Sequence, residues 1–293
     1  MYEPSQPSSD RNFPTSSGFY SAFNRLPDLA PIDVAPPYLA TTQPPMQVVD
    51  TTDTTISPEV PIDPLNSAYP IPWNWVLATY AEFGGPAGQS ADSPRRTRFY
   101  RSPSLMSPDG QYAAYSRIQM QADSHLYGCR VTSVMFLEDT KTGDLRTITA
   151  ASPLSDNPFN DSEAAGNPGA ISILIPVSWS EKGDRLLARQ FEGLFNSSQA
   201  SDYAVVWQRK DRQTFTLVPN TTQYSNAVLL GWSEADRDRV LFKAGNLGEE
   251  HWQIWAVNFK GETILARQDR PIVYGQVLNQ VWTGPQGMRK DGV

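Results

Sequence analysis

Few side chains in this sequence have the types and spacing that catalysis or metal binding requires. The chain contains two histidines, His125 and His251, and one cysteine, Cys129. The histidines are 126 residues apart and show no Asp, Glu or Cys spacing typical of metal ligands. No histidine-containing motif surrounds Cys129, so we expect a buried structural thiol rather than a nucleophile. The sequence therefore assigns no metal site and no catalytic residue.

Three motifs that would indicate enzymatic chemistry are absent from the sequence. It has no Gly-x-Ser-x-Gly elbow of hydrolases. It also has no Gly-x4-Gly-Lys-Ser/Thr phosphate loop and no Gly-x-Gly-x-x-Gly dinucleotide motif, so we expect no cofactor. Carboxylate pairs such as Asp236/Asp238 and Glu249/Glu250 lie in turn-like stretches, where solvated turns explain them better than acid/base chemistry.

One basic cluster stands out between residues 95 and 101. It contains four arginines in seven residues, interleaved with aromatic side chains: Arg95, Arg96, Arg98 and Arg101. Such a cluster predicts contact with an acidic partner surface or a phosphate group. An alternative is that these arginines pair with the acidic N-terminal part of the same chain, in an autoinhibitory contact.

The first 70 residues differ in composition from the rest. They hold 13 of the 25 prolines, two arginines and eight acidic residues, so their net charge is −6 of the total −7. A segment rich in Pro, Ser and Thr and poor in large aliphatic residues cannot bury enough apolar surface to offset the entropy of ordering. We therefore expect a disordered tail over residues 1–70 and one globular domain over residues 71–293.

A short apolar pattern lies inside the predicted tail. Phe19, Tyr20, Phe23 and Leu26 follow the spacing of one helix face, and Pro27 would end that helix. The spacing favours a docking segment that orders on binding a partner, with Phe19, Tyr20 and Phe23 as its contacts. The alternative is a fluctuating apolar patch within a disordered tail.

The domain contains a repeated pattern: an apolar strand, an aromatic residue or Met, a Ser-x-x-Gly turn, and a second strand. The copies are Met106-Ser107-Pro108-Asp109-Gly110, Trp179-Ser180-Glu181-Lys182-Gly183, Trp232-Ser233-Glu234-Ala235-Asp236 and a looser copy over 282–287. Pro and Gly in the first copy suit a tight turn with a positive φ at its end. We expect Trp179, Trp232 and Trp282 to pack between neighbouring sheets, because they occupy the repeated position.

Each repeat predicts about four short antiparallel strands, the content of one propeller blade. In each copy, two further strands joined by a polar turn follow the Ser-x-x-Gly unit; these turns lie at 141–144, 209–212 and 259–262. A strand over 272–281 precedes Trp282 and would begin a fourth copy. The sequence therefore predicts an all-β domain with three blade-like repeats and a partial fourth.

The stretch Ser107-Pro108-Asp109-Gly110-Gln111-Tyr112-Ala113-Ala114-Tyr115 resembles the repeat of TolB-type (WD40-like) beta-propellers, and Trp179-Ser180 and Trp232-Ser233 fit the same repeat. The resemblance covers roughly residues 101–287. It implies a binding platform rather than a particular chemistry. Propellers need about four blades to close, so either residues 71–100 supply the missing strands or the array of sheets stays open.

Charge, hydropathy and cysteine content indicate where the protein is located and which partners it binds. The sequence shows no secretory signal and no apolar run near the ~20 residues that cross a bilayer. A single cysteine suits a reducing compartment, so we expect a cytoplasmic protein. A net charge of −7 and a pI near 4.9 argue against a nucleic-acid surface.

These observations favour a non-enzymatic protein-interaction or scaffold module, built from a β-repeat domain and a docking tail. Two alternatives stay open. The first is an enzyme or carbohydrate-binding module with a site on the blade loops. The second is a structural subunit of a larger assembly, or an oligomer, that pairs through open sheet edges.

Overall fold

The structure is a computed structural model that describes residues 63–83, 96–155, 168–221, 224–278 and 283–286. All of them belong to one compact unit, Ser57–Val293. Residues 63–70, assigned by composition to the tail, are part of this unit. The rest of the predicted tail, including Phe19, Tyr20 and Phe23, lies outside the described residues.

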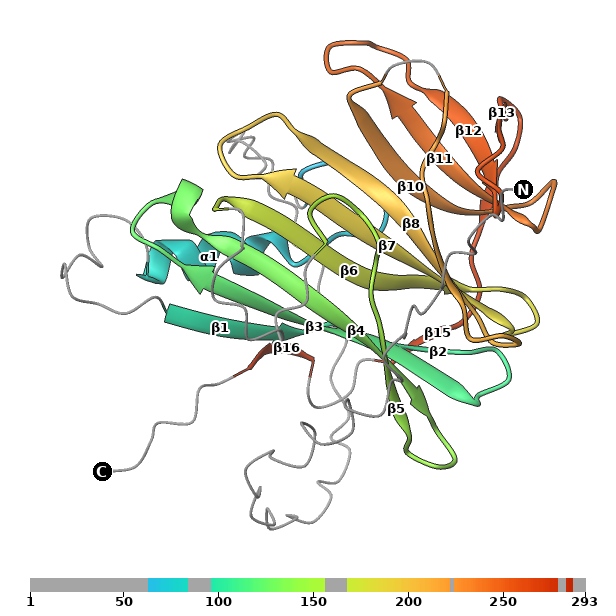
Figure 1. Ribbon diagram of the computed structural model, residues 1–293, viewed down its shortest axis with the longest axis horizontal. Coiled ribbons are helices and arrows are strands. Elements are labelled where there is room, and N and C mark those ends of the chain that lie inside the picture. The colour runs from blue at the N-terminus through green and yellow to red at the C-terminus, as the bar shows by residue number, and fades with distance from the viewer. Residues whose placement is uncertain (1–62, 84–95, 156–167, 222–223, 279–282, 287–293) are drawn as a thin grey trace, which may run out of the picture. The chain divides into compact units, whose positions relative to one another are not determined.

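Three consecutive four-stranded antiparallel meanders form the body of the domain (Figure 1). Meander 1 consists of β2 (Ser104–Met106), β3 (Tyr112–Ala122), β4 (Arg130–Asp139) and β5 (Leu145–Ile148). Meander 2 consists of β6 (Ala170–Trp179), β7 (Arg185–Leu194), β8 (Ala200–Gln208) and β9 (Thr214–Leu217). Meander 3 consists of β10 (Asn226–Ser233), β11 (Arg239–Gly245), β12 (Gln253–Asn258) and β13 (Thr263–Leu265). The predicted all-β class is confirmed.

The meanders are distributed over two sheets. Meanders 1 and 2 share an 11-stranded sheet, joined where β4 runs parallel to β6 at Val131 and Ile171. β1 (Arg96–Arg101) and β16 (Gly284–Gln286) extend this sheet beside β3. Meander 3 forms a five-stranded sheet together with β14 (Pro271–Ile272). Within the described ranges these sheets do not close into a ring.

The first two Ser-x-x-Gly turns are tight turns, as predicted, and each is also held by hydrogen bonds of its serine hydroxyl. In the first turn, the Ser107 hydroxyl donates to Asp109 at 2.6 Å and accepts the Tyr112 N–H at 2.9 Å. In the second, the Ser180 hydroxyl accepts the Arg185 N–H at 3.0 Å. Both turns end on a glycine with a φ near +70°, a region that side chains disfavour. A buried serine therefore holds each turn closed from within.

Residues 271–278 form a strap across all three meanders, rather than the first strand of a fourth repeat. Ile272 pairs with Trp232, Tyr274 with Trp179, and Gln276, the first residue of β15 (Gln276–Leu278), with Met106. These partners are the residues that precede the three serine turns. The predicted continuous strand over 272–281 is thus wrong for its described part, because alternate residues of one segment pair with three different meanders.

A single glycine allows the strap to lie this close to the sheets. Gly275 has a φ of +107°, and a Cβ at this position would lie 2.8 Å from the Met106 carbonyl oxygen and 2.9 Å from the Trp179 ring. Any side chain here would push the strap away from the first two meanders.

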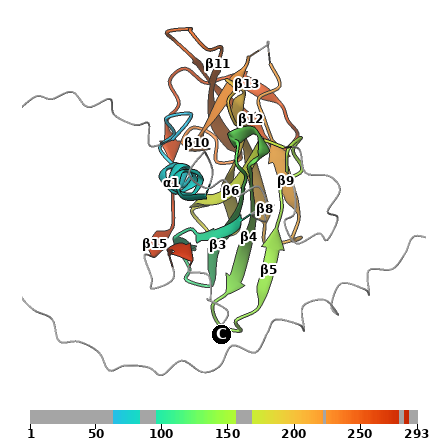
Figure 2. The ribbon, with the colours of Figure 1, turned by 90° about the vertical axis from the view of Figure 1, so that its left-hand side faces the viewer.

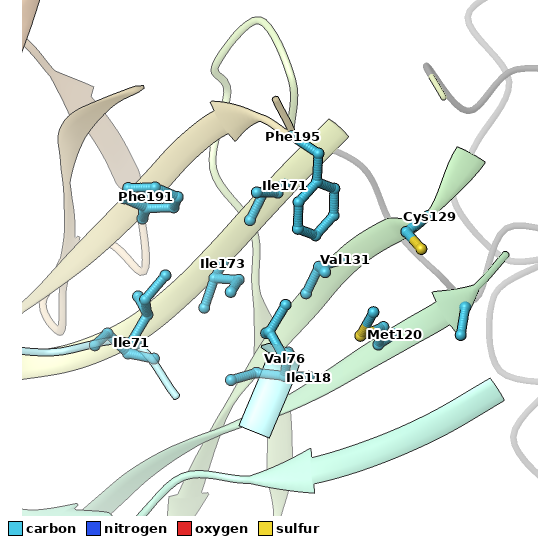
Figure 3. Close-up of a cluster of buried hydrophobic side chains, with 12 residues drawn as sticks. Ile71, Val76, Ile118, Met120, Cys129, Val131, Ile171, Ile173, Phe191 and Phe195 are labelled. Atoms are coloured by element: carbon cyan, nitrogen blue, oxygen red, sulfur yellow. The ribbon is translucent and has the colours of Figure 1, made fainter. Parts of the chain in front are cut away.

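One helix, α1 (Trp73–Phe83), covers a face of the larger sheet (Figure 2). Val76 from this helix packs among Ile118, Val131 and Ile173 of the strands beneath it (Figure 3). Cys129 belongs to the same cluster and is fully buried, and burial raises the pKa of its thiol. The expectation of a buried thiol is confirmed. No helix among the described residues is long and apolar enough to cross a membrane.

Candidate functional site

A cleft of about 720 Å³ opens between meanders 2 and 3. It lies beside the Ser180–Gly183 turn, the polar turns that follow β8 and β12, and the loop between β10 and β11. Its lining contains three aromatic and eight charged residues: Trp232, Phe259, Tyr274, Lys182, Arg185, Lys210, Arg237, Lys260, Glu181, Asp184 and Asp238. The volume is within the range of small-molecule and peptide side-chain sites.

Arg185, the first residue of β7, is largely buried in this cleft. The carbon at the centre of its guanidinium lies 5.1 Å from the centre of the Trp232 ring and 5.4 Å from that of Phe259. Its Nη1 donates to Asp238 Oδ1 at 2.7 Å. Its Nε is buried and finds no acceptor among the described residues; the nearest carboxylate oxygen, on Asp184, is 3.9 Å away. A buried donor without an acceptor is costly, so such a group requires an explanation.

A second ion pair joins the two meanders at the wall of the cleft. Arg237 Nη1 lies 3.1 Å from Glu181 Oε2, and it also contacts the Tyr274 hydroxyl of the strap. Together with the Arg185–Asp238 pair, this contact ties the turn of meander 2 to the loop of meander 3. Both pairs include an exposed partner, so each contributes at most about 1 kcal/mol to stability and mainly sets the geometry of the cleft.

Three lysines at the cleft are exposed and form no ion pair within the described part of the chain: Lys182, Lys210 and Lys260. They come from the turns after β6, β8 and β12. With Arg185 and Arg237 they give five cationic groups against three carboxylates. The cleft is therefore locally cationic although the whole chain has a net charge of −7, and it favours an anionic ligand.

The cleft lacks the groups expected of an acid/base or metal site. Neither histidine lines it: His125 stacks on Tyr127 at 5.1 Å in meander 1, and His251 is exposed before β12. All three carboxylates lie within 3.9 Å of an arginine nitrogen: Glu181 with Arg237, and Asp184 and Asp238 with Arg185. No group of three or more His, Cys, Asp or Glu that could hold a metal ion is found among the described residues.

No family model matches the chain, and no curated protein matches it. Among solved structures, it is similar to one titled glycoside hydrolase, with 10% sequence identity and a TM-score of 0.32. The match covers 68% of this chain, which spans only 65% of the length of that structure. At this TM-score the likeness supports no argument about function.

The arginine cluster predicted as a binding patch is divided between the two faces of β1. The Arg98 guanidinium lies 3.7 Å from the centre of the Phe83 ring, on the side of α1. Arg101 lies 3.8 Å from the centre of the Tyr115 ring and donates to Ser104 Oγ at 3.0 Å. Neither lines the cleft. Arg96 pairs through its backbone with Ala122, and Arg95 lies outside the described residues.

Sequence reasoning missed the cleft lysines because they are far apart in the chain. Lys182 and Lys210 are separated by 28 residues, and Lys210 and Lys260 by 50. A signal was present, since Lys210 and Lys260 occupy the equivalent polar turn of consecutive repeats. Lys141 occupies that turn in meander 1 and does not line the cleft.

A buried cluster of charges lies outside the cleft, beneath the start of α1. Arg189 of β7 is fully buried and contacts two buried carboxylates, Asp63 at 2.7 Å and Asp202 at 2.8 Å. Asp63 also accepts the N–H groups of Leu65 and Ile71, and Asp202 accepts that of Leu229. The cluster thus joins the segment before α1 to meanders 2 and 3. Its buried, mutually satisfied groups indicate a structural role.

The two carboxyls of this cluster differ in pKa. Burial opposes ionisation of Asp63, but the hydrogen bond and charge of Arg189 and the N–H groups of Ile71 and Leu65 hold its pKa below the usual value. Burial of Asp202 is complete and raises its pKa to about 6, despite the charge of Arg189 and the hydrogen bond from Leu229. A single guanidinium cannot fully compensate the cost of burying the negative charges of two carboxylates.

We expect stability to depend on pH through Asp202. Its folded pKa exceeds its unfolded value, so the folded state binds more protons, and stability increases as pH falls through about 6. Between about pH 7 and about pH 5, Asp202 should add about 1–2 kcal/mol to the free energy of unfolding. Urea unfolding at both pH values gives the free energy of unfolding of the wild type and of Asp202→Asn. The difference between the two proteins isolates the contribution of Asp202, because the contributions of the other carboxyl groups cancel. If the difference in the free energy of unfolding between the two proteins is the same at both pH values, the raised pKa of Asp202 is contradicted.

Proposed function

We propose that this chain is a non-enzymatic interaction module that binds an anionic partner in the cleft between meanders 2 and 3. One observation carries the proposal: the buried Nε of Arg185 has no acceptor within the described residues, in a cleft that is also lined by three lysines without ion partners in that part of the chain. A ligand oxygen supplies the missing acceptor once the Arg185 side chain turns its Nε into the cleft, and the lysines compensate the negative charge of the ligand. The paired state of Glu181 and Asp238 supports binding over acid/base catalysis.

The proposal also includes a relationship to TolB-type (WD40-like) beta-propeller repeats. It is supported by the three four-stranded meanders and by the serine turns at Ser107 and Ser180. In this view the partner is a protein, bound where neighbouring repeats meet. The cytoplasmic location expected from the sequence belongs to the same proposal, and the single buried thiol is consistent with it.

We expect reversal of two rim charges to abolish most of the binding. The probe is fluorescein-labelled oligoglutamate, titrated with the full-length chain in fluorescence anisotropy at low and at physiological salt. Lys210→Glu together with Lys260→Glu should weaken binding by about tenfold or more, since each reversal replaces an attraction by a repulsion. Raising the salt concentration should weaken wild-type binding as well.

The matched control is Lys141→Glu, which reverses a charge in the equivalent turn of meander 1. It should leave the affinity within about twofold of wild type, because Lys141 does not line the cleft. Equal losses for the control and for the double variant would mean that the probe responds to net charge alone. The cleft would then not be the binding site.

A second candidate function, assembly through an open sheet edge, is favoured by β13. This strand is the terminal strand of its sheet, and its neighbouring residues Ile264 and Leu265 are 50% and 41% exposed although they point to opposite faces. An apolar edge strand is a template for pairing with another chain. If the chain assembles through β13, light scattering of the full-length protein should give a molar mass above that of a monomer. Ile264→Lys should lower this molar mass. Leu145→Lys, on the edge strand of meander 1, is the control.

A further inference from the structure

We infer that the ligand of the cleft is a short acidic peptide segment that carries an apolar side chain between its acidic residues. This inference rests on the proposed function, because it specifies the anionic partner of the same cleft. Three features of the site lead to it: the distribution of the positive charges, the aromatic lining, and the carboxylates that also line the cleft.

The positive charges are spread around the cleft rather than focused on one point. Lys182, Lys210 and Lys260 come from three separate turns in two meanders, and Arg185 of β7 lines the same cleft. Sites for a single phosphate group typically gather several donors around one position, often backbone N–H groups. A cleft of about 720 Å³ also exceeds what one inorganic anion fills. Separate cations suit separate anionic groups along a chain.

The lining also offers apolar contact beside the charges. The rings of Phe259 and Tyr274 are half-buried and line the cleft, and Phe259 packs on Trp232 with ring centres 6.5 Å apart. An inorganic or purely polyanionic ligand makes no use of these rings. An aromatic or aliphatic side chain placed on them gains apolar burial, while a neighbouring carboxylate or carbonyl oxygen accepts from Arg185 Nε.

Carboxylates in the cleft disfavour a long polyanion such as a nucleic acid. Glu181, Asp184 and Asp238 line the cleft together with the lysines. A long uniform polyanion would extend past the lysines onto these carboxylates and be repelled. A short segment places a few carboxylates at the lysines and ends within the cleft.

The test compares ligands in fluorescence anisotropy with the full-length chain. The probe is a labelled Glu-Asp-Glu-Phe-Glu-Asp-Glu peptide, and one comparison peptide has Ala in place of Phe while another has Gln and Asn in place of the acids. Unlabelled oligothymidylate and tripolyphosphate serve as competitors. We expect the Phe peptide to bind about tenfold tighter than the Ala peptide, as for one buried aromatic side chain. The amide peptide should show no binding, and neither competitor should displace the probe at equal charge concentration.

A conservative variant isolates the buried donor. Arg185→Lys keeps a positive charge but removes Nε, and should weaken binding of the Phe peptide by about tenfold. Arg239→Lys is the matched control, since the side chains of Arg185 and Arg239 are both 16% exposed and both pair with an aspartate. Arg239 does not line the cleft, so its variant should bind as wild type does. Thermal unfolding of both variants verifies that they are folded.

The outcomes separate this inference from the proposed function. If no anionic probe binds, the proposed function fails and the peptide inference fails with it. If tripolyphosphate or oligothymidylate displaces the probe efficiently and the Phe and Ala peptides bind equally, the anionic site stands and the peptide inference is overturned. Equal losses in Arg185→Lys and Arg239→Lys would also overturn the role given to the buried Nε.

Discussion

Replacement of Arg189 by methionine is expected to lower the free energy of unfolding by about 3–5 kcal/mol, the cost of breaking a buried ion pair from one side. The Arg189 side chain is 0% exposed and is shared by Asp63 and Asp202, whose side chains are 1% and 0% exposed. Methionine fills a similar volume, so the loss comes mainly from two carboxylates left in a low-dielectric interior. A domain of ordinary stability would lose a large share of its stability.

Urea unfolding at neutral pH measures this loss, and Arg239→Met provides the control. Arg239 also pairs with an aspartate, but that partner is 52% exposed, so about 1 kcal/mol or less is expected. Neutralising the partners should restore stability: Asp63→Asn and Asp202→Asn added to Arg189→Met should recover much of the loss. Similar costs for Arg189→Met and Arg239→Met would show that the buried cluster does not hold the fold.

The same variant should loosen the segment before α1. Asp63 binds Arg189 and also accepts the backbone N–H groups of Leu65, Ser67 and Ile71. Without the guanidinium, this segment loses its main attachment to meander 2. Hydrogen exchange should therefore speed up at Leu65 and Ile71 more than at the centre of β7.

The repeats could be predicted because their signals are local. A serine followed by a glycine between two apolar runs specifies a turn whose hydrogen bonds stay within a few residues, as at Ser107 and Ser180. The buried positions of Trp179 and Trp232 follow from the same repeat. Local chemistry therefore determined the strands, their turns and the packing residues.

The strap could not be predicted because its partners are distant. Residues 271–278 have the composition of an ordinary strand, and nothing near them indicates that Ile272, Tyr274 and Gln276 pair with three different meanders. Asp63 illustrates the same limit. The composition of a Pro-rich acidic segment indicates disorder, yet a single carboxylate in it meets an arginine 126 residues away.

The candidate site was hidden for a related reason. Charge density along the chain points to the cluster at 95–101, but alternation along β1 places Arg98 and Arg101 on opposite faces. Lys182, Lys210 and Lys260 are isolated in sequence and meet only because consecutive meanders lie next to each other. These lysines can be found only when the contacts between repeats are known, and the sequence pattern within one repeat does not give those contacts.

Substitution of Trp179 by alanine is the second large effect we expect, with a loss of about 3–5 kcal/mol, as for other buried tryptophans. Trp179 is fully buried where the meanders meet. Its indole N–H donates to the Leu105 carbonyl of meander 1 at 3.1 Å, and its own carbonyl accepts the Trp232 indole N–H of meander 3 at 2.9 Å. Its backbone N–H donates to Tyr274 of the strap at 2.9 Å. One residue thus links three meanders and the strap.

The consequence should be lost cooperativity as well as lost stability. The Trp179 ring packs among residues of meanders 1 and 2, such as Leu105 and Trp207, so its removal should separate the unfolding of meander 1 from that of the rest of the domain. Circular dichroism and tryptophan fluorescence, followed through the same urea titration, should coincide in the wild type and diverge in Trp179→Ala.

A milder pair of variants isolates the hydrogen bond between meanders. Trp179→Phe keeps most of the apolar ring but removes the indole donor to the Leu105 carbonyl, and should cost about 1–3 kcal/mol. Trp252→Phe is the matched control, because the Trp252 indole N–H donates at 3.0 Å to Asn246 within the same loop of meander 3. It is only partly buried, so about 1 kcal/mol or less is expected. Equal costs, with coincident transitions in Trp179→Ala, would mean that the meanders are joined mainly by the strap and the buried Arg189 cluster.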